Sequence, residues 1–174
     1  MASASYERIL VAHSQDPVTS IAELELAQVR LEQGRLAEAV SLLQGLTSHD
    51  NPQLAEQALL LEGVVMHRQG EHRQAAERLL RFWQREMSPS MTLLVLMSLA
   101  DSARVQGDFV TSLVCLDRLL SGYLDPTIEE ELRLRMQTQT DELAGETSLE
   151  SLYGSLPRAG VVWPRVARRL ALIV

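Results

Sequence analysis

Two interleaved series of residues recur along the chain at nearly constant intervals, and this repetition restricts the possible folds more than any other feature. Four prolines follow one another at spacings of 35, 37 and 37 residues, and each comes directly after a residue that favours a helix N-cap or a turn. Three glycines, spaced by 36 and 37 residues, each lie 17 or 18 residues after one of these prolines. The two series are Asp16-Pro17, Asn51-Pro52, Ser88-Pro89 and Asp125-Pro126, and Gly34, Gly70 and Gly107. They predict helices that begin at the prolines and end at the glycines.

Small residues flank each of the three glycines at fixed distances. One lies seven positions before the glycine and another lies five positions after it. Small side chains on two facing helices allow the helix axes to approach closely, and glycine tolerates the left-handed backbone of a tight turn. The pattern therefore predicts three helical hairpins with close contacts at Ala27 and Ala39, at Gly63 and Ala75, and at Ala100 and Ser112.

Apolar residues between these markers recur with the period of a helix. Aromatic residues make up only 4% of the chain, so the predicted core consists mainly of leucine and alanine, which favour helices. A pair of helices of this length cannot bury its apolar faces alone, so neighbouring pairs must share a core. We therefore predict an α-solenoid. Its core residues are Leu24, Leu26, Ala27 and Leu31 with Leu36, Val40, Leu43 and Leu46; Leu59, Leu60 and Val64 with Ala75, Ala76 and Leu79; and Leu96, Leu99 and Ala103 with Leu113, Leu116 and Leu120.

Three turn segments resemble the inter-helix turn of tetratricopeptide repeats. They are Gly-Arg-Leu-Ala-Glu-Ala at 34–39, Gly-Glu-His-Arg-Gln-Ala at 70–75 and Gly-Asp-Phe-Val-Thr-Ser at 107–112. The resemblance covers residues 17–125 and implies an all-α, right-handed solenoid with about three full repeats and partial repeats at its ends. The chain departs from that family in its longer period and in its shortage of bulky aromatic residues, with Arg30 at a usually aromatic position. Related helical-repeat families with a looser consensus stay open as alternatives.

The ends of the chain predict partial repeats. Residues 2–14 are expected to form the second helix of a preceding unit, so that the chain begins inside a longer array. A fourth unit is expected to begin with a helix over 127–143, to turn near Gly145 and to end in a short capping element at 149–153. These elements complete a repeat domain over residues 1–156.

The last segment, residues 157–174, changes character. Pro157, Gly160 and Pro164 favour a linker. The final apolar run, Leu170–Val174, is prone to form a β-strand, and we interpret it as the first strand of a truncated following domain.

The order of a helical array, the basic pair Arg168-Arg169 and the strand Leu-Ala-Leu-Ile-Val resembles one known arrangement. Bacterial envelope lipoproteins that activate penicillin-binding proteins, and kindred receptors, place helical repeats before a type I periplasmic-binding-protein domain that opens with such a strand. This resemblance implies a periplasmic location, a lipid anchor in the outer membrane upstream of this chain, and a partner in cell-wall synthesis or ligand sensing. The accessory region of a solute receptor and a cytoplasmic adaptor are the alternative functions.

Composition and motifs argue against several other classes of function. A net charge of −7 disfavours binding to nucleic acid, and no apolar run reaches the roughly 18 residues needed to cross a bilayer. Cys115 is the only cysteine and is expected in the core. No catalytic set, cofactor motif or metal-ligand spacing is recognisable, and His67 and His72 are expected on different helices. We therefore expect a non-enzymatic scaffold.

The surface expected to bind a protein or peptide partner is the concave side of the solenoid, which the first helix of each pair lines in the family that the chain resembles. Its polar members carry most of this prediction, because core packing gives no reason for polar side chains at these positions. Leu24 and Leu60 are equally consistent with a core between repeats, and Asp101 and Arg104 are close enough in sequence to form a surface ion pair instead. The predicted residues are Leu24, Gln28, Leu31, Leu60, Val64, His67, Met97, Asp101 and Arg104.

Overall fold

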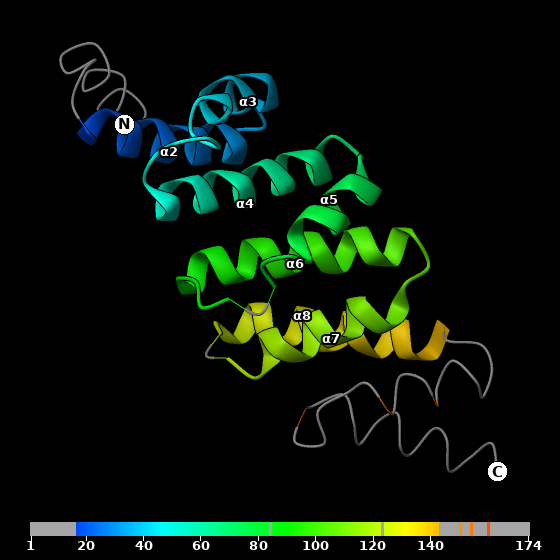
Figure 1. The fold of residues 1–174 in the computed structure, drawn as a ribbon. Coiled ribbons are helices and arrows are strands. Elements are labelled where there is room, and N and C mark those ends of the chain that lie inside the picture. Colours follow the sequence, from blue (N-terminus) through cyan, green and yellow to red (C-terminus); the bar gives the residue numbers. More distant parts are fainter. Residues whose placement is uncertain are drawn as a thin grey trace. The chain divides into compact units, whose positions relative to one another are not determined.

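The computed structural model describes residues 17–83, 85–122, 124–142, 150, 154 and 160, and these residues form an all-α structure (Figure 1). Each helix packs against the next within two compact units, Met1–Arg85 and Glu86–Val174. The first unit contains α2 (Pro17–Glu32), α3 (Leu36–Gln44), α4 (Pro52–Arg68) and α5 (His72–Leu79). The second contains α6 (Pro89–Val105), α7 (Phe109–Leu120) and α8 (Pro126–Glu142).

Pro52, Pro89 and Pro126 stand at the first residue of a helix, as the sequence predicts, and Pro17 is the first described residue of α2. The preceding residues cap these helices where their side chains are described. The Asn51 side chain accepts from the backbone N–H of Gln53 at 3.0 Å, and the Asp125 side chain accepts from Thr127 at 2.9 Å. Proline fits the first turn because its missing N–H would have no partner within the helix. A capping residue and the proline that follows it therefore determine where these helices begin.

The three repeat glycines close three turns with the same hydrogen-bonding pattern. Gly34, Gly70 and Gly107 have φ values of 73°, 83° and 78°, and no other described residue has a positive φ. In each turn the residue after the glycine donates its backbone N–H to a carbonyl five residues earlier. These bonds join Arg35 to Arg30 at 2.8 Å, Glu71 to Met66 at 2.9 Å, and Asp108 to Ala103 at 2.9 Å. Such a bond is typical of a helix that ends in a left-handed glycine, so the three predicted hairpin turns are confirmed.

The first unit consists of two hairpins, α2–α3 and α4–α5, and α4 also packs against α2 and α3. The small residues Ala27, Ala39 and Ala75 are buried, with at most 1% of their surface exposed. Gly63 is buried too, and a Cβ atom added there would lie 2.7 Å from Cδ2 and 2.9 Å from Cγ of Leu79. Because Leu79 is itself fully buried, a side chain at residue 63 would force Leu79 to shift within the contact between α4 and α5.

A charged residue, Arg30, lies in the contact between α2 and α3. It is buried, with 5% of its surface exposed, and its guanidinium Nε lies 3.1 Å from the carboxylate of Glu38 on α3. Its Nη1 donates to the Gln33 side chain at 3.0 Å. The aliphatic part of an arginine can cover apolar surface while the charged end reaches a carboxylate. A paired arginine therefore occupies this place between α2 and α3.

The second unit consists of the α6–α7 hairpin and of α8, which packs against α7. The small residues Ala100 and Ser112 are buried at the hairpin contact. Ser112 also donates its hydroxyl to the buried amide oxygen of Gln139 on α8 at 2.9 Å. Leu132 and Met136 complete the buried face of α8, with 1% and 0% of their surface exposed. α8, the first helix of the predicted fourth repeat, is thus an integral part of this unit.

Several predicted elements lie outside the described residues. These are the helix over 2–14, the turn near Gly145, the capping element at 149–153 apart from Glu150, and residues 157–174 apart from Gly160. The helix predicted over 127–143 is present as α8, which begins one residue earlier, at Pro126, and is described as far as Glu142. In the described part of the chain, no helix combines the length and the apolar character that a membrane crossing requires.

Candidate functional site

The nine predicted partner-binding residues lie on α2, α4 and α6, which are the first helices of the three hairpins. The structure places these residues in two distinct environments. Four of them are aliphatic side chains that lie in the core, with exposed fractions of 6%, 1%, 2% and 0%. Such side chains contact other helices of this chain and offer no surface to a partner. The buried four are Leu24, Leu31, Leu60 and Val64. The other five, Gln28, His67, Met97, Asp101 and Arg104, are half-buried or exposed.

Asp101 and Arg104 do not pair with each other, because each forms an ion pair with α8. Arg135 Nη1 lies 3.0 Å from Asp101 Oδ1, and Arg104 Nη1 lies 3.5 Å from Glu142 Oε2. These side chains are between about one third and one half exposed, so water screens both pairs and each stabilises the fold by less than about 1 kcal/mol. Weak ion pairs of this kind can be exchanged for ion pairs with a partner.

Arg135 connects the two helices because two carboxylates hold its guanidinium. Besides Asp101, it contacts Glu131 one turn earlier on α8, at 3.3 Å. Met97 lies one turn before Asp101 on α6 and is half-buried. The surface formed by Met97, Asp101 and Arg104 on α6, with Glu131, Arg135 and Glu142 on α8, thus combines an apolar side chain with alternating charges. We name these six residues the α6/α8 surface.

The α8 members of this surface were missed by the sequence analysis, although the repeat contains a signal for them. Pro89 and Pro126 are 37 residues apart, so the position equivalent to Arg135 on α6 is Ser98, one turn from Asp101. The position equivalent to Glu142 is Val105, next to Arg104. Opposite charges at nearby equivalent positions of α6 and α8 therefore indicate ion pairs between these two helices. The spacing of Glu131 and Arg135 further indicates a pair within α8.

In the first unit, the polar candidates Gln28 and His67 lie on α2 and α4. The ring of His67 lies 5.4 Å from the ring of His72, measured between centroids, and the two rings are tilted by 59°. The histidines lie on different helices, as predicted, and meet across the Gly70 turn. Within the described residues, no group of three or more histidine, cysteine or acidic side chains is arranged to hold a metal ion.

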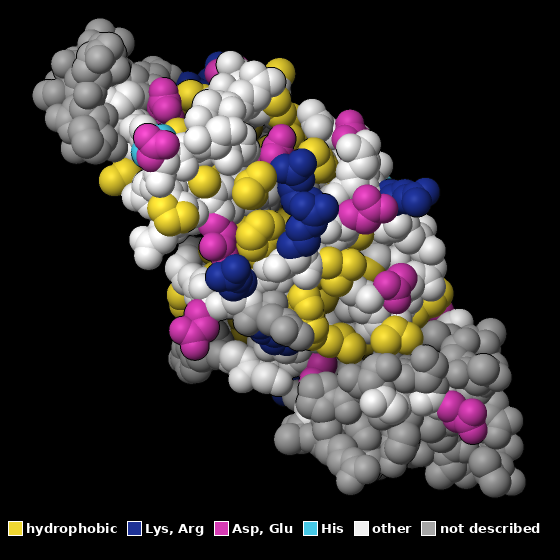
Figure 2. All heavy atoms as spheres, viewed as in Figure 1, with side chains coloured by type: hydrophobic (Ala, Val, Ile, Leu, Met, Phe, Trp, Pro, Cys, Tyr) yellow, Lys and Arg dark blue, Asp and Glu magenta, His cyan; other side chains and the backbone are white. Residues whose placement is uncertain are grey.

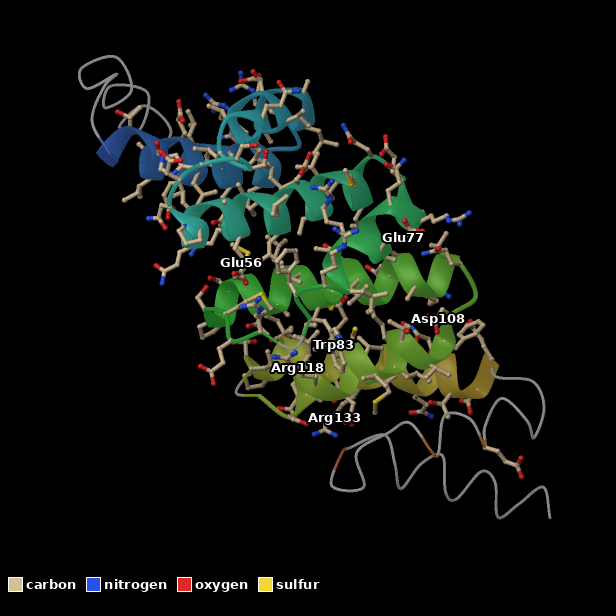
Figure 3. All side chains as sticks on the ribbon, in the orientation of Figure 1. Glu56, Glu77, Trp83, Asp108, Arg118 and Arg133 are labelled. Carbon is tan, nitrogen blue, oxygen red and sulfur yellow. The ribbon has the colours of Figure 1, made fainter. Side chains whose placement is uncertain are left out.

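A small depression lies on the first unit where α5 and the turn after it meet α4. Its volume is about 150 Å³, and it is lined by Met66, Gln74, Glu77, Arg78 and Arg81. Arg78 forms an ion pair with Glu62 of α4 and so holds the two helices together beside the depression. Glu77, labelled in Figure 3, lies on α5 and pairs with Arg73 of the same helix at 3.2 Å.

Cys115 is a core residue, as the sequence predicts, with 1% of its surface exposed. Burial raises the pKa of its thiol to about 12, because the apolar surroundings disfavour the thiolate. The neighbouring Arg118 opposes this shift of the pKa, and Asp108 adds to it. A thiol that stays protonated is a poor nucleophile and a poor metal ligand, so Cys115 contributes to packing.

Comparisons with known proteins gave no match: no protein-family model, no curated protein and no solved structure matches this chain.

Proposed function

We propose that this chain is a tetratricopeptide-like binding module that holds a protein partner and catalyses no reaction. The observation that carries the proposal is the turn geometry. Three hairpins close on glycines with φ values between 73° and 83°, and each turn has the same backbone hydrogen bond. Helical hairpins repeated at 36–37 residues are typical of α-solenoids, which present extended surfaces to partners. The packing of α4 against both helices of the preceding hairpin, and of α8 against α7, supports the same architecture.

The half-buried side chains of the first helices supply the chemistry of a partner surface. The α6/α8 surface offers Met97 as an apolar contact between exchangeable ion pairs, and Gln28 is half-buried on α2. This mixture suits a peptide or a helix of a partner, which needs apolar anchors for affinity and polar groups for orientation.

The cellular setting of the proposal comes from the sequence. The segment that resembles envelope lipoproteins, residues 168–174, lies outside the described part of the chain. On that resemblance, we place the module in the periplasm at the outer membrane, as the N-terminal part of a protein that regulates peptidoglycan synthesis. A lipidated cysteine encoded upstream, after a secretion signal, would favour this setting over a cytoplasmic adaptor. A downstream domain that binds small molecules would favour a solute receptor.

Site-specific photo-crosslinking in the source cells tests the proposed function. Benzoylphenylalanine placed at Gln28 or at Met97 is expected to crosslink to one and the same protein, because both positions lie half-buried on first helices. Mass spectrometry of the adducts identifies that protein. Ser41, an exposed residue of the second helix α3, is the control position and is expected to give no such adduct.

The comparison between positions decides the outcome. Equal adducts from all three positions would indicate random encounter. Absence of any protein adduct at Gln28 and Met97, with the variants folded, would contradict the proposed binding function.

A further inference from the structure

The depression on the first unit lies in the most basic stretch of the described chain. Residues 66–85 contain five arginines and two glutamates, whereas the whole chain has a net charge of −7. Figure 2 shows basic side chains gathered over α5 beside hydrophobic ones. A positive region on an acidic protein attracts negatively charged groups and raises the rate at which they arrive. This basic region therefore favours a partner that carries negative charge.

The ion pairs around the depression leave one of its arginines available. Arg78 pairs with Glu62, and Glu77 pairs with Arg73. Arg81 is exposed and forms no ion pair with any described residue. A guanidinium binds a carboxylate through two parallel hydrogen bonds, a geometry that an incoming aspartate or glutamate satisfies. Arg81 is thus placed to receive an anionic group at the depression.

The size and lining of the depression indicate what kind of molecule carries that group. Its volume of about 150 Å³ is smaller than the roughly 300–1,000 Å³ of typical small-molecule pockets. Met66 contributes an adaptable apolar wall, and Gln74 offers an amide that can donate or accept. A space of this size with these groups accommodates one or two side chains of a peptide.

We propose that the depression lined by Met66, Gln74, Glu77, Arg78 and Arg81 binds an acidic side chain, with an apolar neighbour, from an acidic segment of a protein partner. Arg81 contacts the carboxylate and Met66 contacts the neighbouring apolar side chain. This inference rests on the proposed function as a protein-binding module. It adds the charge of the partner and a second surface, on α4 and α5, that the first-helix candidates do not include.

Fluorescence anisotropy with a fluorescein-labelled peptide of alternating glutamate and leucine tests this inference on the full chain. The Arg81→Glu variant is expected to bind about tenfold or more weakly, because a hydrogen bond between charged groups is replaced by repulsion. Arg81→Lys keeps the charge but not the paired hydrogen bonds, so its affinity is expected to lie between those of the wild type and Arg81→Glu.

Arg68→Glu provides the matched control. Arg68 is exposed, lies in the same basic stretch and forms no ion pair with a described residue, but it does not line the depression. Because Arg68 is exposed to screening by water and salt and makes no contact within the depression, this variant is expected to bind the peptide within about twofold of the wild type. Circular dichroism checks that each variant is folded.

Three results would overturn the inference. They are equal losses of affinity for Arg68→Glu and Arg81→Glu, no loss for Arg81→Glu, and binding to phosphatidylglycerol vesicles that is stronger than binding to the peptide and equally sensitive to Arg81. The last result would mark the stretch as a membrane-binding surface. Crosslinking from Gln28 and Met97 is read separately, so the inference can fail while the proposed function stands.

Discussion

Replacing Leu79 with alanine is expected to lower the free energy of unfolding by about 2–5 kcal/mol. Leu79 is fully buried and fills the contact between α5 and Gly63 of α4. Truncation removes apolar contacts and leaves a cavity that the closely packed hairpin cannot fill. Urea denaturation followed by far-ultraviolet circular dichroism measures the change. Leu80, the next residue, is 41% exposed, and Leu80→Ala is expected to cost less than about 1 kcal/mol.

The same contact makes the effect of Gly63→Ala depend on residue 79. In the wild-type chain the new methyl group would overlap Leu79, and overpacking of about 1–3 kcal/mol outweighs the roughly 1 kcal/mol that alanine gains over glycine in a helix. In the Leu79→Ala background the atoms nearest to the added Cβ are gone, so Gly63→Ala is expected to stabilise the chain. Additive effects of the two substitutions would show that α4 and α5 do not meet at these residues.

A second large loss of stability is expected for Met136→Ala, again about 2–5 kcal/mol. Met136 is fully buried on the side of α8 that packs in the second unit, near the hydrogen bond between Ser112 and Gln139. Its loss tests whether α8 is an integral part of that unit. Leu134 lies on the same helix and is 64% exposed, so Leu134→Ala provides a matched control, with an expected change within about 0.5 kcal/mol.

Equal effects of Met136→Ala and Leu134→Ala in the same denaturation experiment would contradict the position of α8. Such a result would mean that the two sides of α8 do not differ in packing in solution, and that α8 is not part of the folded unit.

The helix boundaries could be predicted from the sequence because they are encoded locally. A capping residue followed by proline fixes a helix start, and a glycine that adopts a positive φ fixes a helix end, with little help from the rest of the chain. Asn51-Pro52 and Gly70 illustrate both rules. The small residues at hairpin contacts were predictable too, because their spacing from each glycine is the same in all three repeats.

The candidate site was less predictable, because exposure depends on packing between helices that are distant in the sequence. Leu31 and Val64 fit the periodicity of an inner face as well as that of a core, and only the packed structure shows that they are buried. The partners of Asp101 and Arg104 lie 34 and 38 residues further along the chain. Arg30 is a further example, since a buried arginine requires the carboxylate that Glu38 of the next helix supplies.

The basic stretch around α5 could not be predicted from the overall composition of the chain. The net charge of −7 favours an acidic surface, and this average conceals a region where arginines outnumber glutamates. Only the ion pairs of Arg73 and Arg78 show which arginine is left for a partner.

Nuclear magnetic resonance tests most directly whether the three helical hairpins close in the same way. Couplings across hydrogen bonds are expected from the amides of Arg35, Glu71 and Asp108 to the carbonyls five residues earlier, with slow hydrogen exchange at all three amides. Exchange at the rate of an unstructured peptide at any of these amides, or a coupling to a carbonyl in a different element, would contradict the account.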